Sequence, residues 1–299
     1  MNEKKQRKST LDKLVSVVMT TFNDSSSCIP TVRSVLNQTY ENLELVVIDD
    51  CSDDFNVLKE NLESLKDPRI RLIGLEKNSK APFARNTGVK ESIGEIICFL
   101  DSDDIWLDSK IEKQLSCVEE KTIVGCKIQA VYSNKVDVAL PVKSEYDESK
   151  SIHSNLFGQN EHNLVLQTSS LMMMKTDFPM LSFDEKLNRH QDFQFVLDAG
   201  RSGFTIKFID EFLVKYIKKV DSNVLNKGWS ISSSQVFLQY YGSTFSAIEK
   251  ENFIITQLLG PSLKHRLFFQ WIKLCRDFDC LNFRFFTKSA IYVLNRVFK

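Results

Sequence analysis

The chain has 299 residues, of which 42% are hydrophobic and 26% are charged, a composition typical of a globular protein. Lys plus Arg and Asp plus Glu each total 39, so the net charge is zero and the composition favours no nucleic-acid partner. The seven cysteines contain no C-x-x-C pair, which argues against a zinc ribbon. Their scatter through apolar stretches is typical of a reducing cytoplasm.

Residues 1–10 are rich in Lys and Arg, but no apolar segment follows them, so we expect no secretory signal. No run approaches the ~18 apolar residues that a membrane-spanning helix needs. We therefore expect a cytoplasmic protein whose contact with a membrane, if it has one, is peripheral.

Short apolar runs alternate with segments of helical spacing in the first third of the chain. These runs are apolar throughout, as in strands of a parallel sheet that helices cover on both faces. The predicted strands are residues 14–19, 43–48, 70–73 and 95–100, and the predicted helices are residues 29–36, 55–65 and 83–92. Ligands bind beyond the carboxyl ends of such strands. Polar clusters at residues 20–24, 49–54 and 101–104 are therefore expected along one edge of the sheet.

The rest of the chain is less regular. Its pattern predicts strands at residues 131–134 and 164–174, a helix at residues 191–199, and a polar loop at residues 144–163. Residues 204–209 and 212–217 are expected to form a pair of strands. Because strands and helices no longer alternate strictly, we expect a mixed sheet here. The pattern is helical from residue 228, with a break expected at Gly260-Pro261.

Asp101-Ser102-Asp103 places two carboxylates two residues apart, directly after a predicted buried strand. Hard divalent cations such as Mg²⁺ and Mn²⁺ prefer oxygen ligands of this kind, and a cation here would stabilise a diphosphate leaving group. The alternative is an acidic turn that caps a helix starting near Asp108.

Two further clusters have both a binding and a structural interpretation. A carboxylate among residues 49–54 can accept hydrogen bonds from a uracil or a ribose, whereas Ser52 or Asp53 can instead cap the following helix. Arg85, in the sequence Ala84-Arg85-Asn86, can clamp a phosphate or a base. Its alternative is a surface position on an amphipathic helix.

The order TTFND, VVIDDCSDD, APFARNTGV and IICFLDSDDIW resembles the family 2 glycosyltransferases with the GT-A fold, over roughly residues 15–113. The resemblance implies that nucleotide-sugar contacts come from the ends of these strands and from the A-R-N helix. Those residues are Thr20, Phe22, Asn23, Asp50, Arg85, Asn86, Asp101 and Ser102. It also implies that Asp101 and Asp103 hold Mn²⁺ or Mg²⁺.

The second half of the chain resembles the family more weakly. Residues 183–187 (FDEKL) followed by residues 190–193 (HQDF) match a segment in which the family carries its catalytic base, which points to Asp192. Gln191 stands where the family often has Glu. The alternative is that Asp192 only caps the helix it opens. Residues 216–222 resemble a segment with a His near the metal or diphosphate. Lys219 takes that place and can serve a phosphate as a point charge.

The C-terminal 38 residues carry eight basic and two acidic side chains, with nine aromatics among them. Basic amphipathic helices of this kind can lie on anionic membranes, here the inner face of a bacterial membrane. The alternative is a helical pair that packs on the catalytic domain.

These observations predict a three-layer α/β/α GT-A domain and an inverting, metal-dependent transfer from a UDP-sugar to a saccharide or lipid-linked acceptor, as in bacterial envelope polysaccharide synthesis. The predicted domains are a basic extension (1–12), a catalytic domain (13–227, divided at residue 113 into a donor half and an acceptor half) and a helical region (228–299). Two other classes stay open: a non-catalytic sugar-nucleotide-binding module, and a nucleotidyltransferase. The Gly-rich N-terminal loop of a nucleotidyltransferase is missing.

Overall fold

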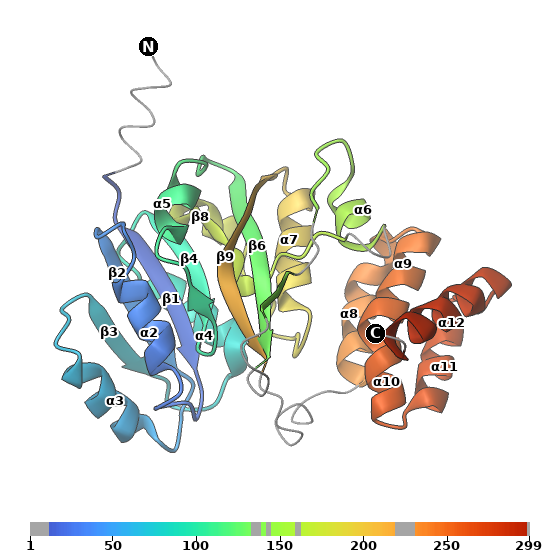
Figure 1. Ribbon diagram of the computed structural model, residues 1–299, viewed down its shortest axis with the longest axis horizontal. Coiled ribbons are helices and arrows are strands. Elements are labelled where there is room, and N and C mark those ends of the chain that lie inside the picture. The colour runs from blue at the N-terminus through green and yellow to red at the C-terminus, as the bar shows by residue number, and fades with distance from the viewer. Residues whose placement is uncertain (1–11, 133–138, 142–144, 159–162, 219–230, 298–299) are drawn as a thin grey trace, which may run out of the picture. The chain divides into compact units, whose positions relative to one another are not determined.

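The computed structural model describes residues 12–132, 139–141, 145–158, 163–218 and 231–297 (Figure 1). The chain forms two compact units. The first comprises residues 1–142, 165–186 and 191–221, and the second comprises residues 143–164, 187–190 and 222–299. Both the predicted basic extension, except for residue 12, and the predicted boundary at residues 227–228 lie outside the described residues.

The described strands of the first unit form one nine-stranded sheet in the order β3-β2-β1-β4-β8-β6-β9-β5, with β7 paired to β6. Their bounds are β1 (Val15–Thr21), β2 (Leu43–Asp49), β3 (Ile70–Gly74), β4 (Ile96–Asp101), β5 (Ile105–Trp106), β6 (Thr122–Tyr132), β7 (Ala139–Pro141), β8 (Met172–Met174) and β9 (Thr205–Lys218). β1 pairs in parallel with β2 and β4, and β2 with β3. β8 is antiparallel to β4, so the predicted mixed sheet is confirmed.

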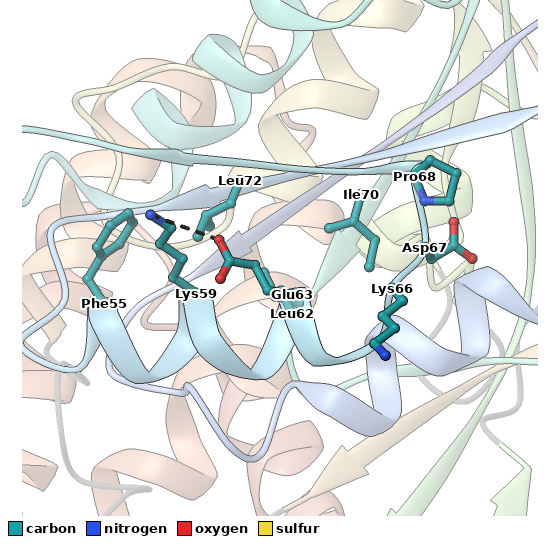
Figure 2. Close-up of a pocket in the computed structure, with 9 residues that line it drawn as sticks. All are labelled: Phe55, Lys59, Leu62, Glu63, Lys66, Asp67, Pro68, Ile70 and Leu72. Carbon is teal, nitrogen blue, oxygen red and sulfur yellow. Dashed lines mark ion pairs between the residues drawn. The ribbon is translucent and has the colours of Figure 1, made fainter.

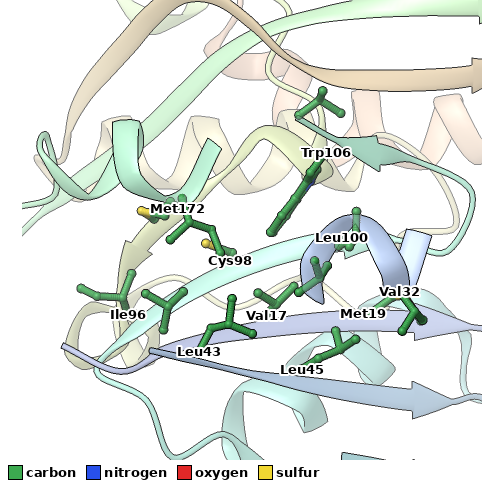
Figure 3. Close-up of a cluster of buried hydrophobic side chains, with 14 of the residues drawn as sticks. Val17, Met19, Val32, Leu43, Leu45, Ile96, Cys98, Leu100, Trp106 and Met172 are labelled. Carbon is green, nitrogen blue, oxygen red and sulfur yellow. The ribbon is translucent and has the colours of Figure 1, made fainter. Parts of the chain in front are cut away.

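Helices cover both faces of this sheet, as the continuously apolar strands predicted. The unit's α-helices are α2 (Ile29–Leu36), α3 (Phe55–Ser64), α4 (Lys80–Glu91), α5 (Lys110–Leu115) and α7 (Gln191–Arg201). Alternate residues of β1, among them Val17, pack on one face in a core that includes Val32 of α2. This core is drawn in Figure 3, with Trp106 at its upper edge.

The opposite face of the sheet packs against α4, and one glycine makes this contact possible. A Cβ built on Gly88 of α4 would lie only 2.2 Å from Cγ1 of Val18 and 3.1 Å from Cγ1 of Ile48. The helix backbone therefore approaches β1 and β2 more closely than any larger residue allows. Because Arg85 and Asn86 lie on the same helix, this contact also sets their height above the sheet.

Two local predictions in the second half of the sheet need correction. Residues 204–209 and 212–217 are not a strand pair, because they belong to the single strand β9, which pairs in parallel with β6 across a bulge at Lys127. The predicted strand at residues 164–174 is reduced to β8, preceded by the 3₁₀-helix η1 (Thr168–Ser170). The backbone of η1 instead bonds to side chains, since Trp106 Nε1 donates to the carbonyl of Ser169 and Gln114 Nε2 to that of Ser170.

The second unit is helical, as predicted for the C-terminal region. Its described helices are α6 (Ile152–Phe157), α8 (Ile231–Tyr241), η3 (Gly242–Thr244, a 3₁₀-helix), α9 (Ala247–Phe253), η4 (Ile254–Leu259, a π-helix), α10 (Gly260–Lys264), α11 (Phe268–Asp277) and α12 (Phe283–Val297). The short helix α6 lies inside the segment predicted to be a loop. No helix in the described part of the chain is long and apolar enough to cross a membrane.

The break expected at Gly260-Pro261 does not occur. α9, η4 and α10 follow one another without interruption, and Pro261 lies in the first turn of α10. Pro261, which has no N–H to donate to the preceding turn, comes directly after the point where the π-helix η4 changes to α10. The chain turns instead after α10, where Arg266 adopts a positive φ of 58°.

Candidate active site

The three polar clusters meet at one edge of the sheet, as the sequence predicted. Thr20 of β1 lies beside Ile48 of β2 and beside Asp101 of β4, and Thr21 lies beside Asp49. The parallel register therefore places the ends of the three strands at the same level. Thr20 is buried, whereas Phe22 in the loop that follows is 50% exposed.

Hydrogen bonds between side chains and backbone join the loops after β1 and β2. The backbone N–H of Asn23 donates to Ser52 Oγ over 2.8 Å, and the backbone N–H of Asp53 donates to Asn23 Oδ1 over 2.9 Å. Ser52 Oγ in turn donates to Asp49 Oδ1 over 2.5 Å. Neither Ser52 nor Asp53 is the N-cap of α3. That residue is Asp54, whose side chain makes no capping bond, so the capping alternative is not supported.

Asp50 holds the start of helix α4. Its two carboxylate oxygens accept the backbone amides of Ser79 and Lys80, each over 2.7 Å. The carboxylate therefore satisfies two of the amides that a helix leaves without partners at its N-terminus. Asp50 fixes α4 relative to β2, and with it the position of Arg85.

The loop after β4 is hydrogen-bonded to the loop after β1 and to helix α2. Ser102 Oγ donates to Asp24 Oδ2 over 2.7 Å, and the Ser102 carbonyl accepts from Thr31 Oγ1 over 2.8 Å. The loop runs into β5 rather than into a helix, and α5 begins after Ser109, so the acidic turn does not cap it. Asp101, Ser102 and Asp103 are all partly exposed and stand above the buried Asp104.

Asp104 is an uncommon buried acid. Ser169 Oγ donates to its Oδ2 over 2.5 Å and Gln167 Nε2 over 2.9 Å, while its Oδ1 has no hydrogen-bond partner. Burial raises the pKa of Asp104 well above its ordinary value, and the nearby charge of Asp101 raises it further. Ser169 Oγ also accepts the backbone amide of Asp101 over 3.0 Å. Ser169 therefore joins the acidic loop to η1.

Arg85 lies at the centre of the site and is only 6% exposed, so the surface alternative is wrong. Its Nη2 donates to Asp101 Oδ1 over 2.6 Å, and its Nη1 donates to Gln191 Oε1 over 2.7 Å. The guanidinium stands 5.2 Å above the ring of Phe183. A planar guanidinium is suited to such a two-sided contact. Arg85 thus links the acidic loop to the residue that precedes Asp192.

The side chain of Asn86 binds the FDE segment. Asn86 Nδ2 donates to the carbonyl of Phe183 over 2.9 Å and to Glu185 Oε1 over 3.0 Å. The Phe183 amide donates back to Asn86 Oδ1 over 3.0 Å. Asn86 therefore fixes Phe183, the ring on which Arg85 rests.

Asp192 lies within the first turn of α7 rather than before the helix, and its Oδ1 accepts the amide of Phe193 over 2.9 Å. Burial raises the pKa of Asp192, whereas the charge of Arg85 lowers it in part.

Tyr216 on β9 lies near the carboxylates of both the acidic loop and Asp192. Burial and the carboxylates of Asp104, Asp103, Asp101 and Asp192 raise the pKa of Tyr216 to about 12. The acidic loop and Asp192 therefore face one region.

This arrangement can be compared with known proteins. The sequence profile described as "Glycosyl transferase family 2" matches residues 16–178, more than half of the chain. The chain belongs to glycosyltransferase family 2. The protein is therefore a glycosyltransferase, and the resemblance inferred from its motifs is confirmed.

Curated relatives agree with this assignment. The amylovoran biosynthesis glycosyltransferase AmsB of Erwinia amylovora is 29% identical over 232 residues, which cover 75% of this chain and 76% of AmsB. The putative teichuronic acid biosynthesis glycosyltransferase TuaG of Bacillus subtilis is 27% identical, over 75% of this chain and 86% of TuaG. The Escherichia coli UDP-Glc:alpha-D-GlcNAc-diphosphoundecaprenol beta-1,3-glucosyltransferase WfgD is 43% identical over 115 residues, which cover 38% of this chain and 44% of WfgD.

Solved structures share the fold. Residues 1–349 of S. aureus TarS, crystallised with UDP-GlcNAc, match with a TM-score of 0.64 and 20% identity, over 91% of this chain and 82% of that one. At this identity the match shows the fold alone. The predicted GT-A fold of this glycosyltransferase is thus confirmed.

Four residues that the structure brings to the candidate site were not identified as site residues from the sequence: Gln167, Ser169, Gln191 and Tyr216. Gln167 and Ser169 lie in an irregular segment without periodicity. Gln191 was noted only as a departure from the family's Glu, and Tyr216 only as part of a weak match. The buried Asp104 gives a signal for Ser169 and Gln167, because a buried carboxylate needs hydrogen-bond donors. The sequence does not say which residues supply them.

The sequence also predicted a role for Lys219 and a bound metal ion. Lys219 lies outside the described residues. Within the described part of the chain, no group of three or more His, Cys, Asp or Glu side chains is placed to hold a metal ion. The donor set nevertheless fits Mg²⁺ or Mn²⁺, because these cations commonly take only one or two protein carboxylates and complete their shell with substrate phosphates and water. Asp101 and Asp103 are two such carboxylates.

A cavity of about 600 Å³ lies elsewhere in the first unit, between α3 and β3 (Figure 2). It is lined by side chains such as Phe55, Leu62 and Ile70, with Lys59 and Glu63 of α3 forming an ion pair at its edge. None of the residues at the ends of β1, β2 and β4 line it. The cavity is therefore separate from the candidate site at the acidic edge of the sheet.

Proposed function

We propose that this glycosyltransferase transfers a sugar from a UDP-sugar, with inversion, to a hydroxyl of a saccharide or lipid-linked saccharide in the synthesis of a bacterial surface polysaccharide. The activities for which AmsB, TuaG and WfgD are named, and the complex of TarS with UDP-GlcNAc, support the donor and the pathway class. The observation that carries the proposal is the Arg85 bridge, which joins the acidic loop at Asp101 to Gln191, next to Asp192.

On the donor side, Thr20 and Phe22 would line the nucleoside pocket. Asn23, Asp50, Asn86 and Ser102 would shape it through the hydrogen bonds that already join its loops. Lys219 would add a positive charge for the diphosphate. Asp101 and Asp103 would hold Mn²⁺ or Mg²⁺, which when bound neutralises the charge that develops on the leaving diphosphate.

On the acceptor side, Asp192 would act as the base. The acceptor oxygen forms a bond to the anomeric carbon as the bond from that carbon to the diphosphate breaks, and the hydroxyl proton passes to the carboxylate of Asp192. UDP leaves with the electron pair, so no covalent enzyme intermediate is needed. The raised pKa of Asp192 makes it a stronger base than an ordinary aspartate.

Arg85 would position both sides. Its two terminal nitrogens bind the carboxylate of Asp101 and the side chain of Gln191, so one buried cation would position a proposed metal ligand and the residue that precedes the proposed base. Because a neutral amide stands at residue 191, Asp101 is the carboxylate that balances Arg85. This difference from the family's Glu also leaves one negative charge fewer beside Asp192.

The direct test is the release of UDP from a panel of UDP-sugars, with Mn²⁺ or with EDTA, in the presence and absence of simple saccharide acceptors. We expect metal-dependent UDP release that an acceptor accelerates. Binding without turnover of any donor would indicate a sugar-nucleotide-binding module. Formation of a nucleotide-sugar from a sugar phosphate and UTP would indicate a nucleotidyltransferase. Either result would overturn the proposal.

A further inference from the structure

Helices α11 and α12 of the second unit expose large aromatic side chains. α11 buries Trp271, Leu274 and Cys275 inside the unit. In contrast, Phe269 is 86% exposed and Phe283, the first residue of α12, is 87% exposed. Single exposed apolar residues are ordinary, but two phenylalanines with almost no cover are costly in water.

Phe268, Phe269 and Phe286 are exposed rings that belong to one continuous row. Phe269 lies 6.3 Å from Phe268, which stacks on Trp271 at 5.5 Å. Trp271 stacks on Phe285 of α12 at 5.4 Å, and Phe285 contacts Phe286 at 6.0 Å. The middle of the row is buried and its ends are exposed. The buried Trp271 and Phe285 therefore connect the exposed rings of α11 to Phe286 of α12. Phe283 lies three residues before Phe286 on α12, a spacing that places two residues side by side on a helix.

Exposed basic side chains accompany this row. Arg284 lies between Phe283 and Phe286 in the sequence, and Lys264 and Arg266 lie just before α11. Lys273 and Arg276 on α11 are also exposed. The acidic side chains of this segment are Asp277 and Asp279, and Asp277 faces Arg276 at 4.0 Å. The surface made by Phe268, Phe269, Phe283, Phe286 and the five basic residues, which we call the aromatic–basic face, is therefore positively charged.

This chemistry fits an anionic lipid surface. Aromatic rings are favoured at the membrane–water interface, and basic residues near them are attracted to anionic headgroups. Helices that lie in the interface combine such an apolar face with Lys and Arg. Since no described helix can span a membrane, attachment of this kind would be peripheral.

We propose that the aromatic–basic face docks on an anionic phospholipid membrane, with Phe269 and Phe283 entering the interface and Arg266 and Arg284 meeting the headgroups. Docking would confine the catalytic unit to the surface that carries a lipid-linked acceptor. The binding itself does not depend on the sugar or the acceptor. It stands or falls separately from the proposed transfer reaction.

The test is sedimentation of the full-length protein with vesicles of phosphatidylglycerol and with vesicles of phosphatidylcholine. We expect binding to phosphatidylglycerol that weakens as salt is added, because salt screens the charges. The double variant Phe269→Ser/Phe283→Ser and the double variant Arg266→Glu/Arg284→Glu should each bind at least about 10-fold more weakly. One basic residue near such a surface contributes roughly a five-fold factor.

Matched controls come from the first unit. Ile93→Ser removes an apolar side chain that is 70% exposed, and Arg33→Glu reverses an exposed charge on α2. Both should bind vesicles as the wild type does, and circular dichroism should show all variants folded. Equal binding by the Phe269→Ser/Phe283→Ser protein and the wild type would overturn the proposal. A second result would also overturn it. If the wild type forms a dimer that does not bind vesicles, and the Phe269→Ser/Phe283→Ser variant is a monomer, the face joins two copies of the chain instead.

Discussion

The two halves of the catalytic unit reach their structure in different ways. β1, β2 and β4 are buried, apolar and parallel, and their register alone places three polar loops side by side. The segment from Gln167 to Asp192 contains a three-residue strand and two 3₁₀-helices. It is held by side chains of the first half: Arg85 and Asn86 from α4, and Trp106 and Gln114 from the region after β4.

The motifs of the first half therefore have two roles: they carry the residues expected to bind the donor, and they hold the second half in place. The residues after β4 carry the acids expected to hold the donor, and they also fix η1 through Asp104 and Ser169. Arg85 and Asn86 fix the segment that leads to Asp192, the proposed base. A substitution in the first half should therefore disturb the acceptor side as well, whereas a change of the base should leave the donor side intact.

The largest effect is expected from Asp192→Asn. An amide cannot accept the acceptor's proton, so transfer should fall by about 10²- to 10⁴-fold. Binding of UDP, measured by titration calorimetry, should stay unchanged because the donor side does not rely on Asp192. Asp198→Asn on the same helix is the control and should retain transfer. Normal transfer by Asp192→Asn would require a different base.

Arg85→Lys tests the bridge between the two halves. Lysine keeps the charge but not the fork that reaches both Asp101 and Gln191. We expect kcat to fall by roughly 10²-fold, as a small misplacement of reacting groups can cost. Arg71→Lys is the control, since Arg71 lies away from the site and donates to both Glu44 and the Glu91 carbonyl from Nη1 alone, so these bonds do not need the fork. If both variants lose activity equally, Arg85 has no special positioning role.

Gly88→Ala tests the scaffold under both halves. The added methyl would meet Val18 at 2.2 Å, so α4 must move away from β1, which should cost about 1–3 kcal/mol of stability. The melting temperature should drop, and transfer should fall because Arg85 and Asn86 move with the helix. Gly242→Ala, whose new Cβ would have no neighbour nearer than 3.6 Å, should melt like the wild type. Unchanged melting of Gly88→Ala would show that α4 is not held by this contact.

The smallest expected effect concerns the pH dependence of transfer. Burial raises the pKa of Asp192, so the activity of the wild type should be lost, as pH falls, at a higher pH than an ordinary aspartate would give. Gln191→Glu adds a negative charge beside the base and should move this acidic limb to still higher pH. A pH profile of kcat/KM measures both. If Gln191→Glu has the same acidic limb in its pH profile of kcat/KM as the wild type, Asp192 is not the group that titrates there.

The sequence predicts the first half of this protein well for a physical reason. Continuous apolar strands with polar ends permit only a buried parallel sheet with its loops at one edge, and Asp49, Asp101 and Thr21 lie there as expected. The second half depends on individual long-range bonds, such as Gln191 with Arg85, which leave no periodic pattern in the sequence. For the same reason, the apolar stretch at residues 164–174 was predicted as a strand, although only residues 172–174 form one and side chains bind the carbonyls of Ser169 and Ser170.

The central claim is that the acidic loop after β4 holds a cation that carries the charge of the leaving diphosphate. Calorimetric titration of UDP into the wild type and into Asp103→Asn, each with Mn²⁺ and with EDTA, tests it most directly. The account predicts that Mn²⁺ strengthens UDP binding to the wild type, and that Asp103→Asn retains the metal-free affinity but loses the gain. An equal gain from Mn²⁺ in both proteins, or no gain in the wild type, would contradict it.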